Sequence, residues 1–425
     1  MRILVRMKDT ALYQQILGIV APWKVSTVNL DLPSGKVTVA VEHSHSSFRC
    51  PLCKTKASIH DHRKKVWRHL DSCQLKTYIE ASVPRITCPK HGVLMIDVPW
   101  SERGSRFTAL FEAFVIMWLE AATFKDVAAR VGLSWDQVDG IQKRAVERGL
   151  ARRESQPVTR MGVDETSFRK GHDYITAIVD TERNVVVDVL DDRKKSTFKQ
   201  WLEEQPESAI STIETVSMDM YEGYINAVLE VVPEAEEKIC FDRFHVAQHF
   251  GRGVDTVRAS EHRAYIKVQG YSVLTHTKHA WLRNSGKTDN RTRPYFMSIT
   301  KMNLKTARAW AIKETASSIW DYVYAGSAEK AWKRLFGWTS RCRLKPMIAA
   351  GKTAKNHLWG ILNAIKHKVS NAAVEGKNAS IKRIKCRACG YRNKERFKRA
   401  IFFHLGGLDL YPEGANRLGF SHLKS

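Results

Sequence analysis

The stretch MGVDETSF, residues 161–168, alternates apolar and polar residues as a half-buried β-strand does, and it carries Asp164 and Glu165 side by side. Neighbouring side chains on a strand point to opposite faces of a sheet, so we expect only one of these acids to reach any given site. A carboxylate held within a sheet needs a partner that offsets its charge. The stretch therefore predicts both a sheet and a charged site in it.

Four further strand-like segments follow, with helix-like segments between them. The strands are expected at HDYITAIVD (172–180), NVVVDVLDD (184–192), IETVSMDM (213–220) and KICF (238–241). The core residues expected from this pattern are Val163, Ile175, Ile178, Val186, Val216 and Met218. The order of the segments predicts a mixed α/β sheet. Asp164 lies within the first strand and Asp219 at the end of the fourth, so their carboxylates converge if these two strands are neighbours.

The charge balance of the chain indicates its partner. The 425 residues include 69 lysines and arginines against 44 aspartates and glutamates, a net charge of +25. Such an excess attracts polyanions, and nucleic acid is the leading candidate. A membrane surface is the competing partner, but no stretch approaches the roughly 18 consecutive apolar residues of a spanning helix. The first residues also lack the apolar core of a secretion signal, so we expect an intracellular protein of several domains.

Two short motifs before residue 100 predict a zinc site. FRCPLCKTK (48–56) carries the pair Cys50 and Cys53, and RITCPKHGV (85–93) carries the pair Cys88 and His91. Each pair can supply two corners of the tetrahedron that a structural zinc ion requires. The alternative is a set of buried thiols without metal. Four unpaired residues could replace one ligand but lack the spacing: His60, His62, His69 and Cys73.

A helix-turn-helix is expected in TFKDVAARVGLSWDQVDGIQKRAVER, residues 123–148. Gly132 can adopt the positive φ of the turn, and Ser134 can cap the second helix. The basic residues that follow favour DNA binding over a helical hairpin without a DNA contact, which is the alternative. The residues expected at DNA from this module are Ser134, Gln137, Lys143 and Arg144.

Five blocks of the sequence resemble the signature blocks of DDE-class insertion-sequence transposases of bacteria, most closely those of the ISL-three group. The blocks are TCPKHGVLMIDVPWSERGSRFT (87–108), GVDETSFRKG (162–171), SMDMYEGY (217–224), CFDRFHV (240–246) and AAVEGKNASIKRIKCRACGYRN (372–393). The resemblance implies a ribonuclease H-like catalytic core with a helical insertion between its second and third metal-binding acids. It places these acids at Asp164, Asp219 and Glu375, with Asp242 and His245 in the accompanying D-x2-H motif.

One departure from the family pattern lies near the third acid. Many relatives have small or basic residues where this chain has Cys386 and Cys389. A second zinc site there is not expected, because no further paired motif is near. The basic residues after Glu375 are expected to bind phosphates flanking the cleaved bond, and they are Lys377, Lys382, Arg383 and Lys385.

The resemblance and the motifs together predict five parts of the chain. They are a strand-rich zinc-binding module (1–100), a helix-turn-helix domain (101–156), the first part of the catalytic core (157–250), a helical insertion (251–366), and the second part of the core with a C-terminal tail (367–425). The insertion holds six of the 12 tryptophans, most of which we expect in its core.

The predicted function is that of a DNA transposase. It would bind the terminal inverted repeats of its element, cleave phosphodiester bonds at the ends and transfer the 3′-hydroxyl ends to target DNA. Hard carboxylate ligands suit two Mg²⁺ or Mn²⁺ ions, and zinc would be structural. Joining two ends implies a homodimer or larger assembly on double-stranded DNA, in the bacterial cytoplasm at the nucleoid. The alternatives are a transposase-derived DNA-binding regulator without catalysis and a nuclease or resolvase on the same fold.

Overall fold

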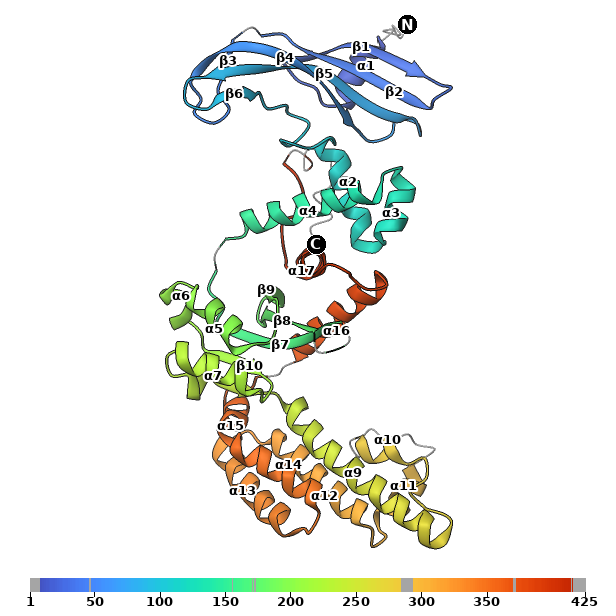
Figure 1. Ribbon diagram of the computed structural model, residues 1–425, viewed down its shortest axis with the longest axis vertical. Helices are drawn as coiled ribbons and strands as arrows, with labels where there is room; N and C mark the ends of the chain where they lie inside the picture. Colours follow the sequence, from blue (N-terminus) through green and yellow to red (C-terminus); the bar gives the residue numbers. More distant parts are fainter. Residues whose placement is uncertain are drawn as a thin grey trace, which may run out of the picture. The chain divides into compact units, whose positions relative to one another are not determined.

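The computed structural model describes residues 8–45, 47–154, 156–169, 171, 173–283, 293–369, 372–413 and 415 (Figure 1). Two compact units make up the chain. The first comprises Met1–Arg153 and Leu408–Ser425, and the second comprises Glu154–Gly407. The finer five-part division stays a prediction, and residues 416–425 of the predicted tail lie outside the described residues.

A twisted sheet of six strands dominates the start of the first unit. The strands are β1 (Trp23–Asp31), β2 (Lys36–His43), β3 (Phe48–Arg49), β4 (Lys56–Arg68), β5 (Lys76–Cys88) and β6 (Gly92–Met95), after the short helix α1 (Asp9–Ile16). Their order is β1-β2-β5-β4-β3, with β6 paired to β5. The long antiparallel pair β4 and β5 brings the two ends that carry the zinc motifs to the same edge of the sheet.

Three helices complete the first unit: α2 (Ala109–Ala121), α3 (Phe124–Val131) and α4 (Trp135–Arg152). Gly132 ends α3 in the left-handed conformation with φ of 66°, as the sequence predicts. Ser134 and Gln137 then form a reciprocal capping box at the start of α4. The predicted helix-turn-helix geometry is confirmed in this local detail.

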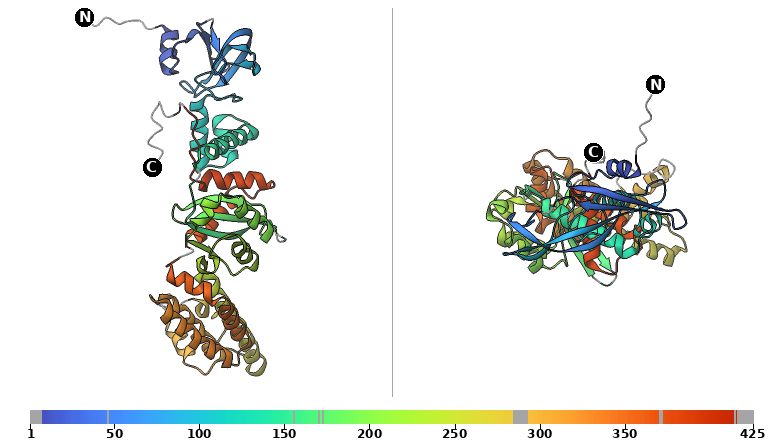
Figure 2. Two further views of the ribbon diagram at one scale, coloured as in Figure 1. Left: turned by 90° about the vertical axis from the view of Figure 1, so that its left-hand side faces the viewer. Right: turned by 90° about the horizontal axis from the view of Figure 1, so that it is seen from above.

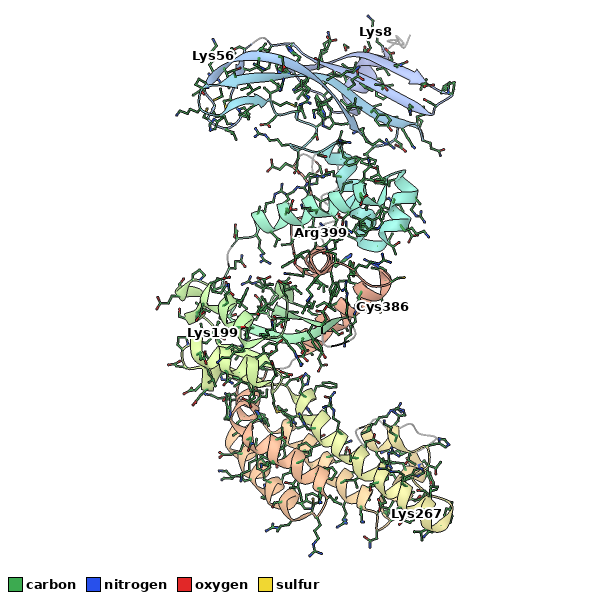
Figure 3. The ribbon with its side chains drawn as sticks, in the orientation of Figure 1. Lys8, Lys56, Lys199, Lys267, Cys386 and Arg399 are labelled. Carbon is green, nitrogen blue, oxygen red and sulfur yellow. The ribbon has the colours of Figure 1, made fainter. Side chains whose placement is uncertain are left out.

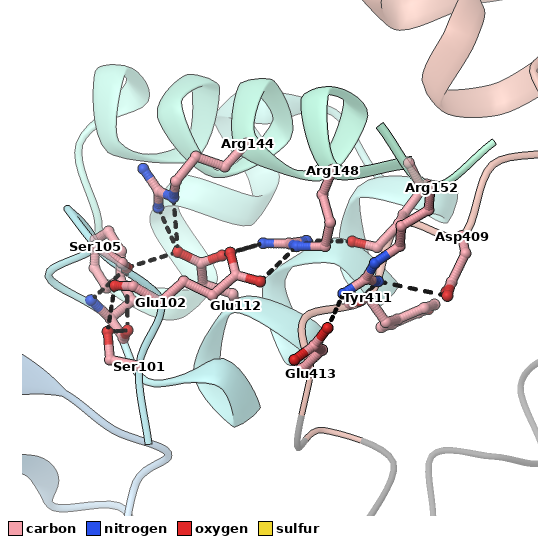
Figure 4. A network of polar contacts seen from close by, with 12 residues as sticks. Ser101, Glu102, Ser105, Glu112, Arg144, Arg148, Arg152, Asp409, Tyr411 and Glu413 are labelled. Atoms are coloured by element: carbon pink, nitrogen blue, oxygen red, sulfur yellow. Dashed lines mark hydrogen bonds and ion pairs between the residues drawn. The ribbon is translucent and has the colours of Figure 1, made fainter. Parts of the chain in front are cut away.

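A buried ionic network joins α2 to α4 (Figure 4). Glu112 on α2 is 1% exposed, and its carboxylate accepts hydrogen bonds from Ser105 at 2.7 Å and from Arg144 Nε at 2.9 Å. Arg148 also donates to Glu112 at 3.1 Å and to Glu102 at 2.6 Å. A buried carboxylate is stable only with such partners, so this network fixes how α4 lies against α2.

The second unit is built on a five-stranded mixed sheet of order β11-β10-β7-β8-β9. Its strands are β7 (Arg160–Arg169), β8 (Asp173–Asp180), β9 (Val185–Leu190), β10 (Thr215–Met218) and β11 (Ile239–Phe241). β7, β8 and β9 are antiparallel, whereas β10 and β11 run parallel to β7. The six predicted core residues are all fully buried, which confirms the predicted mixed sheet.

Helices cover both faces of this sheet (Figure 1). α5 (Lys195–Glu203) and α7 (Glu222–Val231) pack on the face that contains Met161 and Val163. α16 (Ala372–Arg387) and α17 (Lys394–Leu405) pack on the face that contains Phe168 and Ile175. Gly162 permits the close approach of α16, because a Cβ there would lie 2.2 Å from a methyl group of Val374. Short helices α6 (Glu207–Ser211) and α8 (Ala235–Lys238) connect the strands.

A helical bundle extends from the sheet, and the left view of Figure 2 shows its helices gathered at one end of the second unit. Its first helix, α9 (Arg243–Gln269), begins directly after β11 and contains 27 residues, so the predicted boundary at residue 250 falls inside one continuous helix. The other helices are α10 (Lys278–Leu282), α11 (Arg293–Thr300), α12 (Lys305–Ser318), the 3₁₀ turn η2 (Ile319–Asp321), α13 (Ala325–Arg341), α14 (Lys345–Asn356) and α15 (Leu358–Lys366).

The tryptophans of the bundle follow the predicted core role for the most part. Trp281 and Trp332 are fully buried, whereas Trp338 is 41% exposed. None of the helices that the structure describes is long and apolar enough to cross a membrane.

The Glu112 network provides a test of the first unit. Replacing Glu112 with Ala leaves Arg144 without its acidic partner and Arg148 with Glu102 alone, so we expect a loss of about 3–5 kcal/mol in local stability. Native-state hydrogen exchange of the α2 and α4 amides measures this loss. Asp97→Ala is the matched control, because Asp97 pairs with Arg103 on the surface and its removal should cost less than about 1 kcal/mol. Equal effects of the two changes would contradict a structural role for the buried pair.

Candidate functional site

The two predicted zinc pairs meet at one edge of the first sheet. Cys53 Sγ lies 3.5 Å from Cys88 Sγ, and His91 Nδ1 lies 3.6 Å from both Cys50 Sγ and Cys88 Sγ. All four ligand atoms lie within 4.8 Å of one another. A tetrahedral zinc ion with ordinary bond lengths separates its ligands by about 3.5–3.8 Å. The residues therefore fit a structural Cys₃His zinc site, and the predicted ligand set is brought together.

Local hydrogen bonds lower the pKa of Cys53 and Cys88 and so favour the thiolate form that binds metal, whereas burial raises the pKa of Cys50. A hydrogen bond from the Thr55 hydroxyl, at 2.9 Å, lowers the pKa of Cys53 to about 6. Cys50 and Cys88 are buried, at 0% and 2% exposure, which closes the site to solvent on one side. The other candidates, His60, His62, His69 and Cys73, are not part of the group that encloses this position. His69 instead bonds the Thr108 hydroxyl at 2.9 Å.

The predicted catalytic acids Asp164 and Asp219 lie on neighbouring parallel strands. Asp164 is in the middle of β7, and Asp219 directly follows β10, which pairs with β7 from Thr215 to Ser217. Burial raises the pKa of Asp164 to about 6, and the Asp219 charge acts in the same direction. Burial likewise raises the pKa of Asp219. The two carboxylates thus converge in a place where their negative charge is poorly solvated.

An amide on α16 holds Asp164 in position. Asn378 Nδ2 donates to Asp164 Oδ2 at 2.5 Å, and Asn378 Oδ1 accepts from the Thr166 hydroxyl at 2.7 Å. Asp164 and Thr166 are two residues apart, so both face the helix. Asn378 is 8% exposed. Nothing in the sequence alone distinguishes this residue from the polar residues around it, although it lies one helical turn after Glu375 on the same face.

The third predicted acid, Glu375, lies in the first turn of α16 and near the D-x2-H motif. Burial raises its pKa, the charge of Asp242 raises it further, and His245 lowers it. Asp242 caps α9 by accepting a hydrogen bond from the Phe244 amide at 3.0 Å, and it lies 3.8 Å from His245 Nε2. His245 also lowers the pKa of Asp164 and of Asp219, so its charge acts on all three acids.

These carboxylates do not form a group as compact as the zinc ligands. Among the described residues, the group whose ligand atoms all lie within 4.8 Å of one another is the Cys₃His cluster. Ligands on either side of two ions that are about 3.5–4 Å apart need not be mutual neighbours.

Glu165 is the next residue on β7 and so belongs to the other face of the strand, and burial and then the charge of Asp219 raise its pKa. Its carboxylate forms an ion pair with Arg193 at 3.1 Å. The Arg193 guanidinium lies over the rings of Tyr174 and Tyr221, at 4.6 and 5.4 Å. It also lowers the pKa of Asp219, so it is a cation of the site that the sequence did not single out.

The predicted DNA-binding residues fall into two groups. On α4, Ser134 and Gln137 are exposed but use their side chains in the capping box, Lys143 is exposed, and Arg144 is engaged by Glu112. A phosphate contact by Arg144 would have to compete with this ion pair.

On α16, Lys382 and Arg383 are exposed, whereas Lys385 donates to the Ser167 carbonyl at 2.9 Å and burial lowers the pKa of Lys377. Figure 3 labels Cys386 on the same helix, and both Cys386 and Cys389 are exposed.

Comparison with known families identifies these parts. A family model described as a transposase, of the DDE class in the ISL3 group, matches residues 161–401. The chain belongs to the ISL3 family of DDE transposases. The helix-turn-helix domain of transposase family ISL3 matches residues 96–146. The zinc-finger of transposase IS204/IS1001/IS1096/IS1165 matches residues 46–91. The predicted family, the helix-turn-helix and the zinc module are thereby confirmed, whereas the roles of individual acids stay predictions.

Two curated transposases are similar to the chain over most of their length. The transposase for insertion sequence element IS1557 of Mycobacterium tuberculosis is 24% identical over 434 residues, which cover 94% of this chain and 96% of that protein. The transposase for insertion sequence element IS1001 of Bordetella parapertussis is 23% identical over 369 residues, with 86% and 90% covered.

The zinc assignment predicts a loss of metal and of local order when a ligand is changed. We expect Cys88→Ser to reduce bound zinc from one ion per chain to a small fraction and to increase hydrogen exchange in β3 and β6, because the ion supplies folding energy to this edge of the sheet. Elemental analysis and exchange measurements check the two effects.

Cys73→Ser is the matched control for the zinc test, since Cys73 is an exposed free thiol in the same unit. It should keep the full zinc content. Undiminished zinc in Cys88→Ser would contradict the ligand set.

Proposed function

We propose that this transposase cleaves the ends of its own insertion sequence and joins the freed 3′ ends to target DNA, with Asp164, Asp219 and Glu375 holding two divalent ions in a ribonuclease H-like core. The convergence of Asp164 and Asp219 on neighbouring parallel strands carries the proposal. A five-stranded mixed sheet with helices on both faces supports the ribonuclease H-like assignment.

The donor set suits hard divalent cations. Carboxylate oxygens are the ligands that Mg²⁺ and Mn²⁺ prefer. Burial raises the pKa of all three acids, so a bound cation would stabilise their ionised forms. When bound, two ions would supply activation of the attacking hydroxyl and stabilisation of the leaving oxygen.

The residues of the chain have separate tasks in this mechanism. Asn378 donates to Oδ2 of Asp164 and the Glu165 amide donates to Oδ1, so the two hydrogen bonds fix the orientation of this carboxylate. Asp242 and His245 set the local charge around Glu375 and position the start of α9. The exposed Lys382 and Arg383 on α16 are placed to bind phosphates near Glu375. The helix-turn-helix and the zinc module bind the terminal repeats.

Two features of the reaction follow from the proposal. Two ends must be joined to one target, so two or more copies of the chain act together. The substrate is chromosomal DNA, so the place of action is the bacterial cytoplasm.

The catalytic acids are tested by end cleavage. The substrate is a DNA fragment that carries the terminal repeats flanking the gene, with Mg²⁺ present. We expect Asp164→Asn, Asp219→Asn and Glu375→Gln each to lower the cleavage rate by about a thousandfold or more, because metal-stabilised charge is worth several kcal/mol. Binding of the same fragment should be unchanged.

Glu182→Gln is the control, since Glu182 is exposed in the turn between β8 and β9 and pairs with Arg160. It should cleave at the wild-type rate. If an acid-substituted variant also cleaves at that rate, the acid is not a catalytic ligand. If the wild type binds the fragment but does not cleave it, the regulator alternative replaces the enzyme.

The positioning role of Asn378 predicts a smaller and different defect. Asn378→Ala removes one hydrogen bond to a charged group, worth about 1.5–3 kcal/mol, so the cleavage rate should fall by about 10- to 100-fold. The Mg²⁺ concentration for half-maximal cleavage should rise, while fragment binding stays constant. Ser380→Ala on the same helix is the control, because the Ser380 hydroxyl donates to the Gly376 carbonyl and accepts from Arg383 rather than bonding Asp164. A drop in fragment binding in place of a change in Mg²⁺ dependence would mean that Asn378 acts on DNA instead.

A further inference from the structure

A cavity of about 1270 Å³ lies in the second unit, next to the predicted acids. Asp242 and Glu375 form part of its wall. The rest of the wall comes from α9, α10, the segment after η2, the end of α15 and the start of α16. Its aromatic and cationic lining residues are Phe244, Trp320, Tyr322, Arg243, Arg252, Lys278 and Lys368.

Two of the three aromatic side chains at this cavity are well exposed, whereas Trp320 packs against the hydrophobic core of the second unit. Phe244, two residues after Asp242, is 52% exposed, and Tyr322 is 39% exposed. Val323 beside Tyr322 is 69% exposed. A phenylalanine held in solvent next to carboxylates gains nothing from core packing, and its flat face is available for stacking.

The cations of the cavity differ in how they are neutralised. Lys278 pairs with Asp255 at 3.2 Å, and Arg243 pairs with Asp321 at 3.3 Å. Arg252 instead donates to the uncharged amide of Gln248, and within the part of the chain that the structure describes no carboxylate forms an ion pair with it. An arginine without an acidic partner in a cavity suits a phosphate group.

The stacking face and this arginine lie along one line. Phe244, Gln248 and Arg252 follow each other at intervals of four on α9, so they share a face of the helix. The acids lie at the Phe244 end of this line, and the unneutralised arginine lies two turns away. One wall of the cavity therefore carries, in order, the acids, the aromatic ring of Phe244 and the guanidinium of Arg252.

We propose that this cavity binds a short single-stranded DNA segment beside the cleaved bond, with a base stacked on Phe244 and Tyr322 and a phosphate held by Arg252. The proposal rests on the proposed function, because it assigns the substrate strand to the same site. A paired base hides its faces inside the duplex, so a stacking face is useful only to a base that has left the helix. Stacking of this kind tolerates any base, so no preference for one base over another is expected at this site.

Crosslinking of the full-length chain tests the location. The probe is a short oligothymidylate with one 5-iododeoxyuridine, irradiated without added magnesium and with excess duplex DNA to occupy other basic surfaces. We expect the crosslinked residue, mapped by mass spectrometry, to be Phe244 or Tyr322. Crosslinks confined to residues outside the cavity would overturn the proposal.

Affinity for the same oligothymidylate tests the energetics. Phe244→Ala and Arg252→Ala should each weaken binding by about 5- to 150-fold, the range that loss of one stacked base produces. Tyr271→Ala and Arg263→Ala are matched controls, because Tyr271 is 66% exposed, Arg263 is exposed on α9, and neither lines the cavity. The controls should bind as the wild type does, and equal losses in both pairs would refute the site.

The outcome is separable from that of the catalytic proposal. Neither binding measurement requires cleavage, so they stand even if Asp164→Asn proves to cleave normally. Conversely, Phe244→Ala and Arg252→Ala could bind the oligothymidylate normally while the acid variants fail to cleave. That result would refute the role of the cavity and support that of the catalytic acids. Because Phe244 is exposed, its replacement should leave the thermal unfolding midpoint unchanged.

Discussion

The contact of α16 with β7 is the constraint on which the rest of the second unit depends. Asn378 and Asp164 are 214 residues apart in the chain, yet one amide joins them. Gly162 makes room for Val374 in the same contact. Without this contact Glu375 would have no fixed relation to the acids on the sheet, since the whole helical bundle separates them in sequence.

This contact also helps to explain how several acids are held close together in a basic protein. Burial and the charge of Asp219 raise the pKa of Asp164, and burial raises the pKa of Asp219, within a chain whose net charge is +25. Arg193 and His245 offset part of the negative charge. The site is therefore held together by packing and by fixed hydrogen bonds, and its remaining charge is available for a cation.

Local rules account for most of what the sequence predicted. The turn at Gly132, the cap at Ser134, the zinc pairs and the strands around Val163 and Val216 each depend on residues a few positions apart, and all of them are present in the structure. The convergence of Asp164 and Asp219 needed only the further condition that their strands are neighbours.

Contacts between distant segments were not predictable in the same way. In the sequence, Glu112 cannot be told from any other acid of an amphipathic helix. Its burial depends on two arginines of α4, which follow more than thirty residues later. Asn378 and Arg193 contact acids of β7 only because the fold places this strand between α16 and the segment before α5. The extent of α9 was also missed, because a helix that passes from a core into an insertion has no sequence break to mark the passage.

Because α9 is continuous from the acids into the helical bundle, it couples the position of the bundle to that of the site. With 27 residues at 1.5 Å each, α9 is a rod of roughly 40 Å whose first turn carries His245 beside the acids. A load applied at the far end, near the labelled Lys267 in Figure 3, tilts the whole rod, since no hinge interrupts it. Binding of DNA or of another copy of the chain to the bundle would thus change the orientation of His245 relative to the acids.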